Sequence, residues 1–233
     1  MDPLVISHAA CGGHAPANTL AGVRKAIELG SDAIEIDVQA TSDGVPVLMH
    51  DLTVDATTNG TGAVAGMTLG QMRELDAGGE PPPTLAEVLE LTKGRVLLVC
   101  EIKQPGIEEH LRDAVLEAGP LDDVMAWSFF PQALENMRLA EPRIPCALLV
   151  SPQSLPNWPG MRGTAVRLGL QGVSVFFAGV DEALALDCRR HGLSLYTWTS
   201  DPSEAIQRLI TLGVDGICTN FPDRAVALLR RGG

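Results

Sequence analysis

The 233-residue sequence has little positive charge. It contains 17 Lys and Arg against 29 Asp and Glu, which gives a formal net charge of −12 at pH 7. A chain this acidic repels the phosphates of nucleic acids and of anionic membranes, so we expect neither as a partner. An anionic small molecule would need a local device for binding, such as a metal ion or the free N–H groups of a helix N-terminus.

Closely spaced cysteines are also missing. The five cysteines are odd in number and form no CxxC pair, which argues against a disulfide framework and a zinc ribbon. Cys100, Cys146 and Cys218 lie inside apolar runs, where cysteine is usually a small core residue. We therefore expect a reducing compartment and assign the protein to the cytoplasm.

Long apolar segments are absent as well. The longest strongly apolar stretch covers residues 96–100, which is far too short to span a bilayer. The first apolar run begins at Leu4 and is already typical of a β-strand, so we expect no signal peptide. The sequence predicts no integral membrane segment, and it predicts no particular oligomeric state.

Short apolar runs instead alternate with longer segments of helical periodicity. Most of the runs are nearly continuous in apolar residues, as in parallel strands covered on both faces. The predicted strands are residues 4–8, 33–38, 96–102, 124–129, 146–150, 172–177, 194–199 and 216–219. The predicted helices are residues 19–29, 84–92, 107–118, 131–140, 161–168, 181–191, 202–212 and 222–230.

Eight strand–helix units in a chain of this length favour a closed (β/α)₈ TIM barrel, forming one domain over residues 1–233. An open doubly wound sheet is the alternative, but its GxGxxG phosphate fingerprint is absent. One unit is irregular, because a second β-like run and a polar, Gly-rich stretch follow the second strand. We predict a small insertion at about residues 45–66, a loop or hairpin on the mouth of the barrel.

Three carboxylates lie at or near strand ends. Glu35 and Asp37 are two residues apart on the second predicted strand, so they point to the same face, and Glu101 lies near the end of the third. Barrels carry functional groups at this end, and three converging carboxylates repel one another unless a cation neutralises them. Oxygen ligands favour Mg²⁺ or Ca²⁺ over Zn²⁺. The structural alternative is an ion pair between Glu101 and Lys103, with Glu35 and Asp37 merely solvated.

Other polar and aromatic residues accompany this acidic cluster. A lone histidine on an apolar strand is usually a satisfied core residue, but His8 and His50 flank three carboxylates, and imidazole titrates near neutrality. Acid–base catalysis by this pair is therefore favoured. Asn220 opens the last helix, where barrels often bind phosphate, although a plain helix cap is the simpler alternative. Trp198 and Phe129, near strand ends, either wall a cleft or pack in the core.

Together these segments resemble the glycerophosphodiester phosphodiesterase family, nearly from end to end. The motifs that carry the resemblance are His8, Pro16-Ala17-Asn18-Thr19-Leu20, Glu35-Ile36-Asp37, His50-Asp51, Asn59-Gly60-Thr61-Gly62, Glu101-Ile102-Lys103, Ser128-Phe129, Trp198-Thr199 and Gly213 to Asn220. The resemblance implies a (β/α)₈ barrel that hydrolyses a glycerophosphodiester to glycerol 3-phosphate and an alcohol. It further implies Mg²⁺ or Ca²⁺ on the three carboxylates, His8 and His50 as the acid–base pair, and Lys103 facing the substrate phosphate.

Three positions depart from the family's pattern. Ala9 stands where the family has Arg, Ala17 where it has Glu, and Ala56 where it often has Arg. The first Arg would be expected to grip phosphate bidentately, and losing a hydrogen bond to charge costs about 1.5–3 kcal/mol. If that Arg and the Glu were partners, losing both would avoid a stranded charge. The departures predict reduced or shifted turnover. They leave two alternatives, a non-catalytic barrel that binds metal and phosphodiester, and a lyase that forms a cyclic phosphate.

Overall fold

Eight parallel strands form a closed barrel. The computed structural model describes residues 2–119 and 121–230. The barrel strands are β1 (Leu4–Ser7), β2 (Ala33–Ala40), β4 (Leu97–Ile102), β5 (Val124–Ser128), β6 (Cys146–Val150), β7 (Gly172–Phe176), β8 (Ser194–Trp198) and β9 (Gly216–Thr219). Neighbours in this series pair in parallel, and β1 pairs with both β2 and β9, which closes the ring. The predicted (β/α)₈ barrel is confirmed.

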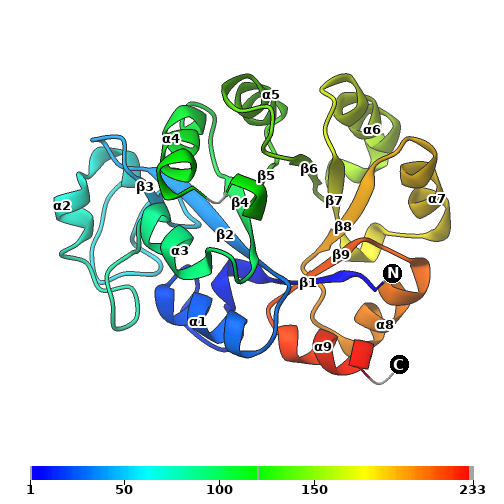
Figure 1. The fold of residues 1–233 in the computed structure, drawn as a ribbon, viewed down its shortest axis with the longest axis horizontal. Helices are drawn as coiled ribbons and strands as arrows, with labels where there is room; N and C mark the ends of the chain where they lie inside the picture. Colours follow the sequence, from blue (N-terminus) through cyan, green and yellow to red (C-terminus); the bar gives the residue numbers. More distant parts are fainter. Residues whose placement is uncertain (1, 120, 231–233) are drawn as a thin grey trace.

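Helices cover the outside of the strands, as Figure 1 shows. They are α1 (Leu20–Glu28), α3 (Leu85–Thr92), α4 (Glu108–Ala118), α5 (Pro131–Ala140), α6 (Trp158–Arg167), α7 (Glu182–Arg190), α8 (Ser203–Leu212) and α9 (Pro222–Arg230). Because side chains alternate along a strand, Ile34 and Ile36 pack against the helices while Val99 and Trp127 fill the barrel interior. The sequences of the strands are therefore nearly continuous in apolar residues.

The insertion after β2 is present and contains regular structure. Strand β3 (Pro46–Leu48) pairs antiparallel to β2, and this pairing extends β2 to Ala40, two residues past its predicted end. A short helix, α2 (Leu69–Met72), follows and was not predicted, because four residues are too few to show helical periodicity. Val47, Met49, Val54 and Val64 pack with Met72 of α2 into a separate small apolar core, so the inserted segment extends past its predicted end at about residue 66.

Element ends differ from the prediction by one to three residues. Four predicted strands run one residue too far, to His8, Phe129, Phe177 and Thr199. Helix α6 begins three residues early, at Trp158, because proline is tolerated in the first turn of a helix. Short 3₁₀ helices occupy several loops: η1 (His8–Ala10), η2 (Val64–Gly66), η3 (Leu121–Asp123), η4 (Leu155–Asn157) and η5 (Phe177–Gly179). Among the described residues, no helix combines the length and apolarity needed to cross a bilayer.

Candidate active site

Three carboxylates meet at the C-terminal mouth of the barrel. Glu35 and Asp37 lie on β2 and Glu101 lies on β4, the adjacent parallel strand. One oxygen from each of the three carboxylates lies within 4.8 Å of the other two. The predicted cluster is thus assembled by strand register and side-chain alternation, and it does not depend on a loop.

Burial makes this cluster electrostatically costly. Glu35 and Asp37 are only 2% and 1% exposed. Burial, followed by repulsion from Asp37 and Glu101, raises the pKa of Glu35 well above its usual range. Burial likewise raises the pKa of Glu101, and Lys103 only partly offsets this. The described side chains around the three carboxylates therefore supply too little positive charge to stabilise all three in the ionised form.

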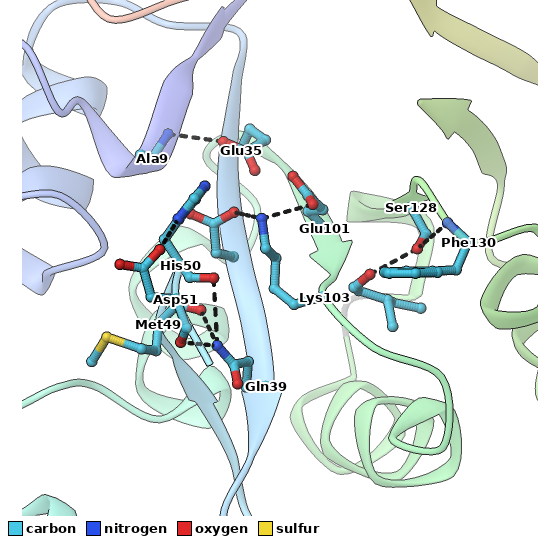
Figure 2. Close-up of polar contacts among 12 residues, drawn as sticks. Ala9, Glu35, Gln39, Met49, His50, Asp51, Glu101, Lys103, Ser128 and Phe130 are labelled. Atoms are coloured by element: carbon cyan, nitrogen blue, oxygen red, sulfur yellow. Dashed lines mark hydrogen bonds and ion pairs between the residues drawn. The ribbon is translucent and has the colours of Figure 1, made fainter. Parts of the chain in front are cut away.

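Lys103 provides part of that charge. Its Nζ lies 2.8 Å from Glu101 Oε1 and 3.2 Å from Asp37 Oδ1. Burial alone would lower the pKa of Lys103, but the two carboxylates outweigh it and raise the pKa, which keeps the ammonium charged. The ion pair of the structural alternative is present, yet Glu35 and Asp37 are buried rather than solvated. One lysine cannot offset three carboxylates, and Figure 2 shows its contact with Glu101.

The cluster fits a divalent metal ion. Glu35 Oε2 accepts a hydrogen bond of 2.8 Å from the Ala9 N–H, but Glu35 Oε1 is buried without a hydrogen-bond partner among the described residues. A buried carboxylate oxygen without a donor needs an explanation, and a cation shared with Asp37 and Glu101 supplies one. The donor set, three carboxylate oxygens, suits a hard cation such as Mg²⁺ or Ca²⁺.

Asn18 fixes Asp37 and was not predicted as a site residue. Its Nδ2 donates to Asp37 Oδ2 at 2.7 Å, and its Oδ1 accepts from the Asp37 N–H at 3.0 Å. This leaves Asp37 Oδ1 for Lys103 and the cluster. The only signal in the sequence is the position of Asn18 within the motif that follows His8.

His8 lies immediately after β1, and one of its ring nitrogens is hydrogen-bonded to another side chain. Its Nδ1 is 2.8 Å from Oδ1 of Asn220, and Nδ2 of Asn220 donates to Asp201 Oδ2 at 2.9 Å. The side chain of Asn220 thus lies between His8 and Asp201. Asp201 was not predicted, because it becomes relevant only when the barrel places the ends of β1, β8 and β9 together.

His50 lies on the insertion, and β2 holds the segment that carries it. Its Nδ1 is 2.7 Å from Asp51 Oδ1. The buried amide of Gln39, two residues beyond Asp37 on β2, donates to the backbone oxygens of Met49, at 3.0 Å, and of Asp51 (Figure 2). Gln39 therefore ties the His50 segment to the strand that bears two of the carboxylates, a role for which the sequence offers no signal.

These groups surround one cavity of about 210 Å³. Its charged and titratable side consists of His8, Glu35, His50, Glu101 and Lys103, and its mostly apolar side consists of Trp127, Phe129, Leu149, Trp198, Thr199 and Cys218. The rings of Phe129 and Trp198 pack edge to face with centroids 5.2 Å apart. The structure therefore brings both histidines, the lysine and the two predicted aromatic residues together around the acidic cluster. Asn220 is not among the residues that line this cavity.

The positions of the missing Arg and Glu lie close together. A Cβ built on Gly12 would be 3.7 Å from the Cβ of Ala9 and 3.6 Å from that of Ala17. Side chains at positions 9 and 17 thus flank the same glycine, which is compatible with the hypothesis that the Arg and the Glu were partners. Arg162 does not replace the missing Arg, because it pairs with Asp187, and neither residue lines the cavity.

The match to known proteins agrees with this geometry. Residues 8–224 match the Glycerophosphoryl diester phosphodiesterase family. The chain belongs to this family. It is 38% identical to a glycerophosphodiester phosphodiesterase of Caldanaerobacter subterraneus subsp. tengcongensis, over 100% of both chains. The family resemblance inferred from the motifs is confirmed.

Solved structures of family members share the barrel. A putative glycerophosphoryl diester phosphodiesterase from Silicibacter pomeroyi is 27% identical and superposes with a TM-score of 0.92, covering 99% of this chain and 94% of its own. A phosphodiesterase from Oleispira antarctica, in complex with the product sn-glycerol-3-phosphate, is 26% identical with a TM-score of 0.89, covering 98% of this chain and 97% of its own. Membership of this family of hydrolases makes a phosphodiester the substrate class to consider.

Proposed function

We propose that the protein hydrolyses glycerophosphodiesters to glycerol 3-phosphate and an alcohol, with the help of a divalent metal ion. The observation that carries the proposal is the convergence of three carboxylates, a lysine and two histidines on one cavity, in a chain of this family. The product complex of the Oleispira antarctica relative supports glycerol 3-phosphate as the product here.

Glu35, Asp37 and Glu101 would hold the metal ion, Mg²⁺ or Ca²⁺. When bound, such an ion neutralises the carboxylates and polarises the phosphoryl oxygens. Lys103 contributes beside it, because an ammonium has three N–H donors and only two of them are directed at Asp37 and Glu101. The third donor is left for a phosphate oxygen of the substrate.

His8 and His50 would move the protons. One imidazole accepts the proton of the attacking hydroxyl, which belongs to water or to the substrate's own glycerol. The other imidazole donates a proton to the alkoxide that leaves when the P–O bond breaks. When water attacks, one displacement gives glycerol 3-phosphate and the free alcohol. When the glycerol hydroxyl attacks, the alcohol leaves and a cyclic phosphate forms, and water must then open that ring to give glycerol 3-phosphate.

The apolar side of the cavity would position the substrate. Phe129 and Trp198 present carbon surface to the C–H groups of the diester and keep water away from the polar side. Ser128 fixes the strand end that carries Phe129, since its Oγ donates to the Ile102 carbonyl at 2.7 Å and accepts from the Phe130 N–H at 3.1 Å. Asn220 was predicted to bind the substrate. We propose instead that it orients the ring of His8, which in turn contacts the substrate.

Ala9 and Ala17 would make this enzyme slower than relatives that retain the Arg and the Glu, or would shift its substrate preference. The described lining residues of the cavity include one permanent cation, Lys103, and it already binds two carboxylates. The cytoplasm remains the predicted location, in keeping with five free and buried cysteines.

Phosphorus NMR tests the proposal directly. Purified protein is incubated with glycerophosphocholine and related diesters in Mg²⁺, Ca²⁺ or EDTA. We expect glycerol 3-phosphate to form with metal, to be absent with EDTA, and to be lost in His8→Ala. His110→Ala serves as the matched control, because His110 is exposed on α4 and outside the cavity. A cyclic phosphate as the end product would indicate a lyase, and the absence of product from every diester would refute catalysis.

A further inference from the structure

Three consecutive strands of the barrel bring His8, Asn220 and Asp201 together. Ser7 on β1 pairs with Thr219 on β9, so His8 and Asn220 are the next residues outward on two neighbouring strands. Strand β8 lies on the other side of β9, and Asp201 follows it. The three side chains therefore form a row along the rim of the mouth, although His8 and Asn220 are 212 residues apart.

Asp201 is anchored by donors other than the Asn220 side chain. Its Oδ1 accepts from the Asn220 backbone N–H at 2.9 Å and from the Thr219 hydroxyl at 3.0 Å. Its Oδ2 faces the Asn220 side-chain amide, and the Nδ2–Oδ2 distance is 2.9 Å. The carboxylate is thus fixed relative to the backbone of β9 and presents one acceptor to the amide.

The orientation of the Asn220 amide follows from this arrangement. A carboxylate only accepts hydrogen bonds, so the NH₂ group of Asn220 must face Asp201 and its carbonyl oxygen must face His8. A carbonyl oxygen also only accepts, so Nδ1 of His8 carries the proton at this contact. The described residues make no hydrogen bond to Nε2, and His8 lines the cavity. A neutral His8 thus has its free lone pair on Nε2.

We propose that Asp201 is a positioning residue that fixes the tautomer of His8 through the amide of Asn220, so that the neutral imidazole presents Nε2 to the cavity as a proton acceptor. The inference rests on the proposed catalytic role of His8.

The substitution Asp201→Asn should reverse the direction of the hydrogen bonds that run from residue 201 through Asn220 to His8. The new amide keeps an oxygen for the Asn220 N–H and the Thr219 hydroxyl, and it turns an NH₂ group toward the Asn220 side chain. The Asn220 amide then flips, its NH₂ group faces Nδ1 of His8, and the proton moves to Nε2. Two-dimensional ¹H–¹⁵N spectra of the imidazoles, with His8 assigned from the His8→Gln variant, should show this change. We expect kcat to fall about 10–100-fold with little change in KM.

A second substitution should restore the original tautomer. In Asp201→Asn combined with Asn220→Asp, the carboxylate at position 220 accepts from both the amide at position 201 and Nδ1 of His8. Nδ1 is again protonated, and we expect kcat to recover most of its value. A purely structural role of Asp201 would not predict recovery from two substitutions in contact. If Asp201→Asn does not fold, Asn220→Ala tests the same link, because loss of the acceptor should leave the His8 proton shared between both ring nitrogens.

Asp223→Asn is the matched control. Its carboxylate also binds a histidine, His14, at 2.7 Å, but that histidine does not line the cavity. This variant should retain the His8 tautomer and wild-type kcat. The proposal is overturned if His8 keeps its Nδ1 proton in Asp201→Asn, or if the double variant leaves the proton on Nε2. The spectra do not depend on turnover, so a protein that hydrolyses no diester but shows the tautomer change would refute the proposed function and leave the role of Asp201 intact.

Discussion

Asp37 on β2 lies directly beside Glu101 on β4 in the parallel register of the two strands. Both side chains point into the barrel mouth, and Lys103 contacts both of them. Two like charges at neighbouring register positions destabilise a sheet unless a cation lies between them. The pairing therefore links the stability of the mouth to whatever cation is bound there, and it leads to the first prediction.

Mg²⁺ or Ca²⁺ should raise the thermal stability of the protein. A ligand that binds only the folded state stabilises it by about 2.7 kcal/mol at a concentration of 100 times Kd. Differential scanning calorimetry with metal and with EDTA should show the shift, and Glu35→Gln should abolish it. Glu182→Gln, on the exposed start of α7, should retain it. Identical melting temperatures with and without divalent metal would count against the site.

Loss of the Gln39 amide should reduce the catalytic rate while leaving metal binding largely intact. In Gln39→Leu the backbone oxygens of Met49 and Asp51 lose their buried donor, which costs about 1–3 kcal/mol of folding free energy and frees the His50 segment. We expect kcat to fall at least about 10-fold while the metal-induced shift in melting temperature persists. Gln132→Leu, a substitution of an exposed glutamine on α5, is the control and should behave as wild type. A Gln39→Leu enzyme with normal kcat would show that the His50 segment holds itself in place.

Restoring the missing pair should accelerate the reaction. Ala9→Arg together with Ala17→Glu returns a bidentate cation to the mouth and gives it a carboxylate partner. One added hydrogen bond of about 1.5–3 kcal/mol to the phosphate corresponds to about a 10–150-fold gain in kcat/KM. Steady-state kinetics of the two single variants and the double variant would form a complete cycle. A double variant no better than Ala9→Arg alone would refute the idea that the two side chains act as partners.

The stabilisation that Glu87 gives to the start of α3 should be lost at acidic pH. Burial alone would raise the pKa of Glu87, but hydrogen bonds from Arg73 and Thr84 outweigh it and lower the pKa below 4.5. A folded-state pKa below the unfolded one contributes stability near neutrality, and the contribution is lost as the pH falls through the folded pKa. Glu87→Gln should therefore lower the free energy of unfolding at pH 7, and the difference from wild type should vanish in acid. Urea titrations across this range, with Glu90→Gln on the exposed face as control, test the sign.

The acidic cluster could be predicted from the sequence because it depends only on side-chain alternation along a strand and on the order of the strands. Glu35 and Asp37 share a face through the two-residue period of a strand, and Glu101 lies near the end of the next barrel strand, so topology alone brings the three together. The same holds for the barrel itself, since eight alternating units leave few ways to bury their apolar faces.

The supporting residues could not be predicted in this way. Asn18, Gln39 and Asp201 matter only through contacts made after the barrel closes, and polar residues near strand ends are common in any sequence. Asn220 illustrates the limit. Its place at the start of α9 suggested a phosphate contact, whereas closure of β9 against β1 turns its side chain toward His8. Sequence periodicity reveals which face a side chain occupies, but not which side chain from a distant segment meets it.

Strand β2 has a consequence for how the active enzyme is assembled. Glu35, Asp37 and Gln39 occupy alternate positions on one strand, so a single pairing frame sets two metal-ligand candidates and the support for His50. A slip of one residue would point all three toward the helices at once. A misregistered molecule would thus lose two of the three metal-ligand candidates and the support of His50 at the same time, which makes activity a sensitive report on correct folding of β2.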